Sequence, residues 1–113
     1  KFNLKIIKAI SVGSLMDLEY AKSYKNIVDW ILFDYKDDLL AGGTGKSFDW
    51  SLLDKNSLNF NWILSGGLDY NNIELALKST SASAVDVSSG VEFKKGIKSI
   101  ELIKEFCNKI NNI

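Results

Sequence analysis

Residues that could do chemistry gather where apolar runs of the chain end. A carboxylate can donate or accept a proton, and a glycine lets backbone amides approach an anion closely. Three runs end in such residues, namely Asp34 after the second run, Gly66 and Gly67 after the third, and Asp86, Ser88, Ser89 and Gly90 in and after the fourth. If these ends meet, one ligand would face an acid, hydroxyls and amides.

Composition limits the chemistry that these residues can support. The 113-residue chain has no His, which removes the usual general base near neutral pH and the commonest metal ligand, and its basic residues are all Lys. Fourteen basic residues offset fourteen acidic ones, and this balance argues against nucleic acid or an anionic membrane as a partner. The lone Cys107 cannot form an internal disulfide, so a reducing compartment, the cytoplasm, is expected.

The elements that must position these residues alternate along the whole chain. Short, mostly apolar runs predict strands at residues 4–12, 29–34, 61–65 and 84–87. Apolar residues at three- and four-residue intervals predict helices at residues 14–24, 48–53, 72–79 and 97–110. Strands apolar on both faces belong in parallel sheets covered by helices, so we expect one α/β domain over residues 1–113.

The carboxyl ends of parallel strands meet at one edge of the sheet, where ligands bind in such folds. Glycine loops after the last two strands therefore predict a phosphate site there. Each feature also has a plainer interpretation, since glycine pairs are common tight turns and a strand-end Asp is often a helix cap or a solvated carboxylate. The glycine-rich loop at residues 37–47, which contains Gly43, lacks the spacing of a nucleotide P-loop.

Taken together, three segments resemble the C-terminal half of phosphoribosylanthranilate isomerase. They are LFDYK with LAGGTGKSFDW, then WILSGGLDYNNIELAL, then AVDVSSGVEFKKGIKS. The resemblance implies half of a (β/α)8 TIM barrel, with this chain supplying strands five to eight. It also implies an enzyme of tryptophan biosynthesis that uses neither cofactor nor metal. Its reaction is the Amadori rearrangement of N-(5'-phosphoribosyl)anthranilate to 1-(o-carboxyphenylamino)-1-deoxyribulose 5-phosphate.

The resemblance also assigns roles to individual residues. Asp34 stands where the family has the general acid that protonates the ribose ring oxygen, and an apolar barrel mouth would favour its protonated form. Asp86 matches a family aspartate near the substrate hydroxyls, and a structural role for it stays open. The residues matched to substrate and phosphate binding are Gly43, Gly66, Gly67, Ser88, Ser89 and Gly90. Ser65 departs from the usual alanine of the family.

Two parts of the family's site have no counterpart in the chain. The general base is a cysteine in a K-x-C-G-type block on the first strand, and an arginine from the N-terminal half holds the anthranilate carboxylate. Cys107 lies on the last predicted helix and cannot replace that cysteine. We therefore expect the chain alone to be inactive, as a C-terminal fragment of an isomerase or as a non-catalytic phosphate-binding half-barrel module.

Half a barrel leaves two open strand edges, which other strands must cover. The missing N-terminal half could supply them. A second copy could also do so, giving a homodimer that closes head-to-tail into one barrel. A flavodoxin-like open sheet is the other arrangement that four βα units allow.

Overall fold

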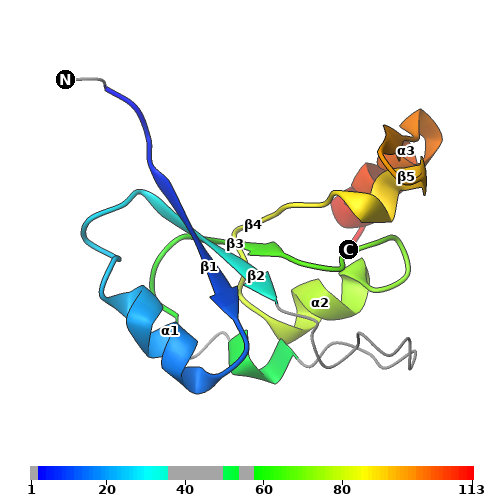
Figure 1. Ribbon diagram of the computed structural model, residues 1–113. Coiled ribbons are helices and arrows are strands. Elements are labelled where there is room, and N and C mark those ends of the chain that lie inside the picture. The colour runs from blue at the N-terminus through cyan, green and yellow to red at the C-terminus, as the bar shows by residue number, and fades with distance from the viewer. Residues whose placement is uncertain (1–2, 36–49, 54–57) are drawn as a thin grey trace.

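The computed structural model describes residues 3–35, 50–53 and 58–113. In these residues the main sheet has four parallel strands in the order β1-β2-β3-β4 (Figure 1). The strands are β1 (Ile7–Val12), β2 (Trp30–Tyr35), β3 (Trp62–Ser65) and β4 (Ala84–Val85). The predicted α/β class and the parallel sheet are confirmed, while the glycine-rich loop with Gly43 lies outside the described residues.

Helices follow the strands much as the periodicity predicts. They are α1 (Leu15–Lys22), the 3-10 helix η2 (Trp50–Leu53), α2 (Ile73–Ser79) and α3 (Ile100–Asn111). The predicted start of α1 at Ser14 is confirmed, because the Asp17 carboxylate accepts the backbone N–H groups of Gly13 at 2.8 Å and of Ser14 at 3.0 Å. No helix in the described part of the chain is both long and apolar enough to cross a membrane.

The core lies between the sheet and the helices α1, η2 and α2, which share one side of it in Figure 1. Alternate strand residues point into this core, so Ile10, Phe33 and Leu64 lie within it. The rings of Phe33 and Trp62 meet edge to face with their centroids 5.4 Å apart. Residues between them, such as Ser11 and Asp34, point to the opposite face.

The C-terminal region differs from the prediction. After β4, the short 3-10 helix η3 (Ser89–Val91) leads into an antiparallel hairpin of β5 (Glu92–Lys94) and β6 (Ile97–Lys98). Gly96 turns this hairpin with a φ of 84°. The last helix was predicted from Ile97, but it begins at Ile100 because the Ser99 hydroxyl caps it by accepting the N–H of Leu102 at 3.1 Å.

Three other predicted boundaries also shift. The first strand begins at Ile7 rather than at residue 4, and the fourth ends at Val85 rather than at residue 87. The described part of the second predicted helix is a single 3-10 turn, Trp50–Leu53. For the two strands, the predicted run extends beyond the residues that pair with the neighbouring strand, and this pairing sets the observed bounds.

Candidate functional site

Asp34 lies near the carboxyl end of β2, against the loop that follows β3. Its side chain is exposed, and its strand register pairs it with Ser65. Gly66 has a φ of 102°, and a Cβ placed on it would come within 2.9 Å of Asp34 Oδ1 and 2.6 Å of the Tyr35 carbonyl oxygen. Glycine is therefore required at this position, and it lets the backbone after β3 approach the Asp34 carboxylate.

A row of polar side chains crosses the carboxyl edge of the sheet. Register pairing places Ser11 beside Asp34 and Asp34 beside Ser65. Asp86 continues the row one residue beyond the Leu64–Val85 pair, and its carboxylate accepts the Ser65 hydroxyl at 2.9 Å. The predicted meeting of Asp34 and Asp86 at one edge is thus observed, with the buried Ser65 between them.

The loops after β3 and β4 touch each other. A Cβ placed on Gly90 would overlap the carbonyl oxygen of Leu68, so these two backbones pack with no room for a side chain. Gly67 also has a positive φ, 66°, and its carbonyl accepts the Asn72 side-chain amide at 2.8 Å. The two predicted phosphate loops therefore form one continuous surface beside Asp34.

The loop after β3 is stabilised by hydrogen bonds between its own residues. Asp69 Oδ1 accepts the backbone N–H of Asn71 at 2.8 Å and of Asn72 at 3.0 Å. In return, Asn72 Oδ1 accepts the N–H of Asp69 at 2.8 Å. These reciprocal bonds stabilise the turn between β3 and α2, which follows Gly66 and Gly67.

The second loop is followed by a charged pair on the hairpin. Lys98 donates to the Glu92 carboxylate, which also accepts the Gly96 N–H at 3.1 Å. The hydrogen bond from Lys98, and next that from Gly96, lower the pKa of Glu92 below its ordinary value. The hairpin therefore holds a carboxylate and an ammonium group together near Ser88.

The other predicted residues lie away from this edge or outside the described residues. Cys107 is exposed on α3 and does not lie at the carboxyl end of a strand of the main sheet. Gly43 lies outside the described residues. Within the described ranges, no three His, Cys, Asp or Glu side chains gather in a way that could hold a metal ion. The carboxylates, amides and hydroxyls at the sheet edge are groups that can transfer a proton or bind an anion.

Sequence reasoning missed two members of this region. Ser11 lies in the polar row, but a single serine inside an Ile-rich run gives no sign of it. Lys98 contacts the second loop through a hairpin whose turn carries just one glycine, Gly96. The spacing of Glu92 and Lys98 around that glycine was the available signal for the hairpin.

Comparison with known proteins identifies one family by sequence and by structure. The family model described as N-(5'-phosphoribosyl)anthranilate (PRA) isomerase matches residues 1–109. The N-(5'-phosphoribosyl)anthranilate isomerase of Zymomonas mobilis subsp. mobilis is 44% identical over 108 residues, which are 95% of this chain and 51% of the relative. The chain thus spans about half the length of the curated relatives it matches.

Solved structures agree with the sequence comparison. The phosphoribosyl anthranilate isomerase of Thermotoga maritima superposes with a TM-score of 0.81 at 37% identity, covering 98% of this chain and 53% of that protein. A second structure, an isomerase in complex with reduced 1-(o-carboxyphenylamino)-1-deoxyribulose 5-phosphate, has a TM-score of 0.71 at 31% identity. It covers 97% of this chain and 50% of that protein. The chain therefore corresponds to about half of each of these proteins.

Proposed function

The chain belongs to the N-(5'-phosphoribosyl)anthranilate isomerase family, and from that membership we propose that it supplies strands five to eight of a (β/α)8 barrel that isomerises N-(5'-phosphoribosyl)anthranilate. One observation carries the proposal. The Asp34 carboxylate lies against Gly66, at the edge where the loops after β3 and β4 touch. An acid beside two glycine loops suits a substrate with a ribose ring at one point and a phosphate at another.

Asp34 acts in this proposal as the general acid. Its carboxyl donates a proton to the ribose ring oxygen, the bond from that oxygen to C1' breaks, and the anthranilate nitrogen becomes an iminium. A base then removes the C2' proton, giving an enolamine that tautomerises to the ketone product. Proton donation to the leaving oxygen lowers the barrier for ring opening, and this is the step that Asp34 serves.

The two touching loops bind the substrate phosphate. Gly66 brings the first loop close to Asp34, Gly67 follows it with a second positive φ, and Ser88, Ser89 and Gly90 form the second loop. Backbone amides in such loops bind phosphate oxygens without a charged side chain. Asp86, whose carboxylate is held by Ser65, accepts a substrate hydroxyl.

The reaction also needs a base and a group that binds the anthranilate carboxylate. In the family these come from the N-terminal half of the barrel. Cys107 does not replace the base, because it is exposed on α3 rather than near Asp34. We therefore propose that the chain alone is inactive and that a second polypeptide segment completes the site.

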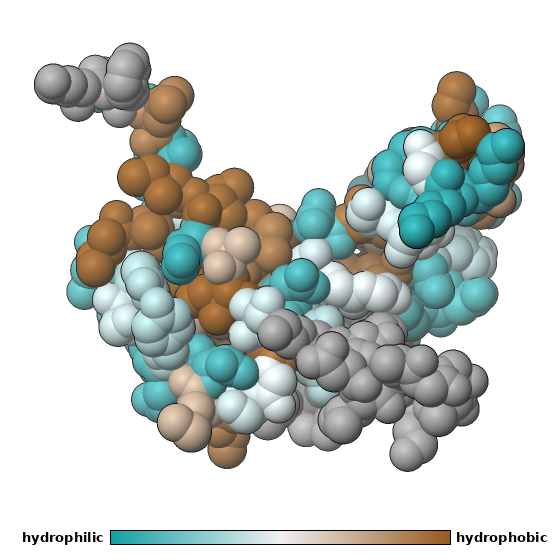
Figure 2. All heavy atoms as spheres, viewed as in Figure 1, coloured by the Kyte–Doolittle hydropathy of each residue, from teal (hydrophilic) through white to brown (hydrophobic). Residues whose placement is uncertain are grey.

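The surface of the sheet supports the need for such a segment. β1 is at the edge of the sheet, so one side of its backbone has no strand beside it in the described residues. Ile6 and Ile7 are each 54% exposed there, and Figure 2 shows apolar side chains gathered over β1. An N-terminal half with four more parallel strands would cover this edge. A second copy, closing the barrel head-to-tail, is the alternative partner.

A reconstitution experiment tests the proposal. The purified chain is mixed with a separately purified N-terminal half of the Zymomonas isomerase, and conversion of N-(5'-phosphoribosyl)anthranilate is measured. We expect turnover in the mixture and none with either part alone. Asp34→Asn, an isosteric change that removes the acidic proton, should abolish it. Turnover by the chain alone would contradict the proposed inactivity.

The same samples distinguish the isomerase from the second candidate function, a non-catalytic phosphate-binding half-barrel. A chain that binds inorganic phosphate and forms a homodimer in light scattering, yet gives no turnover with the N-terminal half, would favour that module. A monomer that becomes a stable heterodimer on mixing would favour the isomerase half. Backbone amides on the open side of β1 should become protected in hydrogen exchange in either assembly.

A further inference from the structure

Lys98 connects the β5–β6 hairpin to the second glycine loop. Its ammonium group donates to the Ser88 carbonyl oxygen at 2.9 Å and to the Ser88 hydroxyl oxygen at 3.1 Å. It also donates to Glu92 Oε2 at 2.5 Å. Lys98 and Glu92 are opposite each other in the hairpin, whereas Ser88 lies ten residues before Lys98 and outside the hairpin.

These contacts restrict the direction in which the Ser88 hydroxyl can donate its hydrogen. A lysine ammonium has three donors and no acceptor, whereas a hydroxyl both donates and accepts. Since Ser88 Oγ accepts from Lys98, its own hydrogen points elsewhere and can be donated to an anion. The bond to the Ser88 carbonyl holds the backbone at the same point, directly before the amides of Ser89 and Gly90.

We propose that Lys98 is a positioning residue of the phosphate loop, which orients the Ser88 hydroxyl and backbone toward the phosphate group of the substrate. This inference rests on the proposed function of that loop. Lys98 acts through Ser88 and, by its charge, at longer range on the phosphate. Glu92 offsets that charge and keeps the ammonium at the base of the loop.

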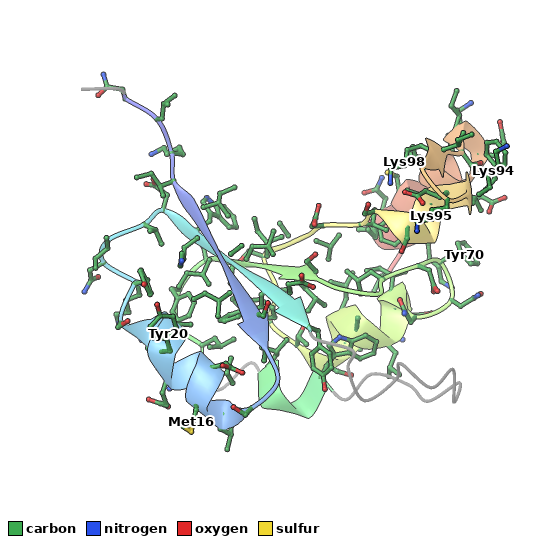
Figure 3. The ribbon with its side chains drawn as sticks, viewed as in Figure 1. Met16, Tyr20, Tyr70, Lys94, Lys95 and Lys98 are labelled. Atoms are coloured by element: carbon green, nitrogen blue, oxygen red, sulfur yellow. The ribbon has the colours of Figure 1, made fainter. Side chains whose placement is uncertain are left out.

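The other lysines of the hairpin differ from Lys98 in these respects. Figure 3 shows Lys98 on the side of the hairpin nearer the main sheet and Lys94 on the far side. Lys94 and Lys95 are exposed, and neither has a described hydrogen bond to the loop. They therefore provide matched controls, because each removes a positive charge from the same hairpin without a contact to Ser88.

A titration of the full chain with inorganic phosphate, followed by the NMR amide shifts of Ser88, Ser89 and Gly90, tests the inference. We expect Lys98→Met to raise the Kd for phosphate about tenfold, as the loss of a charge-assisted hydrogen-bond network predicts. Lys94→Met and Lys95→Met should change it less than twofold. Lys98→Arg retains a charged donor and should restore most of the affinity.

Glu92→Gln separates positioning from simple support of the hairpin. It removes the ion pair with Lys98 but keeps an oxygen that can accept from Lys98 and Gly96, and it leaves the Lys98 charge uncompensated near the loop. We expect phosphate to bind at least as tightly as in the wild type. If Lys98 merely stabilised the hairpin, Glu92→Gln and Lys98→Met would weaken phosphate binding alike, and this result would overturn the inference.

Kinetics of the reconstituted enzyme provide a second readout. With the N-terminal half present, Lys98→Met should raise KM about tenfold and change kcat less than twofold, because the phosphate is remote from the reacting atoms. An unchanged KM would overturn the positioning role and leave the proposed function intact. If the wild-type chain binds no phosphate, alone or with the N-terminal half, the proposed function itself fails.

Discussion

The two faces of the main sheet differ in how far the chain completes them. On the helix-covered face, Phe33 and Trp62 are fully buried. On the opposite face, Leu32 and Ile63 are half-buried, although they are neighbours of those residues in the same strands. Helices therefore bury the side chains on one face of the sheet. The side chains on the other face, which holds Asp34 and which we call the open face, are partly exposed in the described residues.

This difference follows from strand geometry. Side chains alternate between faces, so each strand contributes to both, and α1, η2 and α2 cover one side of the sheet. In a closed barrel the other side would be filled by residues from all eight strands. Leu32 and Ile63 on the open face are only half-buried, and the cost of this exposed apolar area would fall if other strands covered it, as the proposed barrel requires.

The largest effect should come from deleting a buried ring. Phe33→Ala removes a side chain that packs on Trp62, and we expect it to lower the free energy of unfolding by about 3–5 kcal/mol. Leu32→Ala, on the open face, should cost only about 1 kcal/mol in the chain alone. Urea unfolding of both variants provides the comparison. A Leu32→Ala cost equal to that of Phe33→Ala would mean that the open face is already covered.

A smaller effect is expected at the glycine beside Asp34. Gly66→Ala must adopt a positive φ and would crowd the Tyr35 carbonyl and the Asp34 carboxylate, so we expect a loss of about 2 kcal/mol or more. Gly96→Ala also needs a positive φ, but its Cβ would meet no described atom within 4 Å. It should cost about 1 kcal/mol. Equal losses in thermal unfolding would show that the close approach to Asp34 adds nothing.

The polar row should be less sensitive still. Ser65→Ala removes the hydroxyl that donates to Asp86, and we expect a loss of about 1 kcal/mol. Ser11→Ala, at the exposed end of the same row, should change stability by less than about 0.5 kcal/mol. A double-mutant cycle with Asp86→Asn measures the Ser65–Asp86 coupling directly. Zero coupling would contradict the hydrogen bond.

The smallest effect is a pH dependence of the hairpin. The pKa of Glu92 is lowered by Lys98 and Gly96, so their interaction is complete above about pH 4.5 and is lost as the pH falls through the lower folded pKa. The amide shift of Gly96 should follow this titration in NMR spectra. In Glu92→Gln the same amide should not titrate in that range. A midpoint at or above the ordinary value for glutamate would contradict the lowered pKa.

The sequence predicted the covered face better than the open one. Apolar runs ending in Asp34 and Ser65 predicted two of the strands to within one residue, because burial between layers demands such runs. Alternation alone could not show which face the helices cover. It also could not show that Ser11 joins the row, since strand pairing decides that.

The hairpin was the main error, for a local reason. Ile97, Ile100 and Ile103 have the spacing of one helix face, and this pattern hid the turn at Gly96. The Ser99 cap ends the strand and starts the helix between two residues of that pattern. The roles of the glycine loops came from the family resemblance, while the contact between Gly90 and Leu68 required the fold.

The in-register row at the strand ends has a consequence for how this protein can change over evolution. Ser11, Asp34 and Asp86 are exposed, and substitution of exposed residues usually costs little stability. Buried residues in the same strands, such as Ile10 and Phe33, keep the strands aligned when these exposed positions change. New reactivity can therefore arise here one substitution at a time, with the scaffold preserved while the chemistry is exchanged.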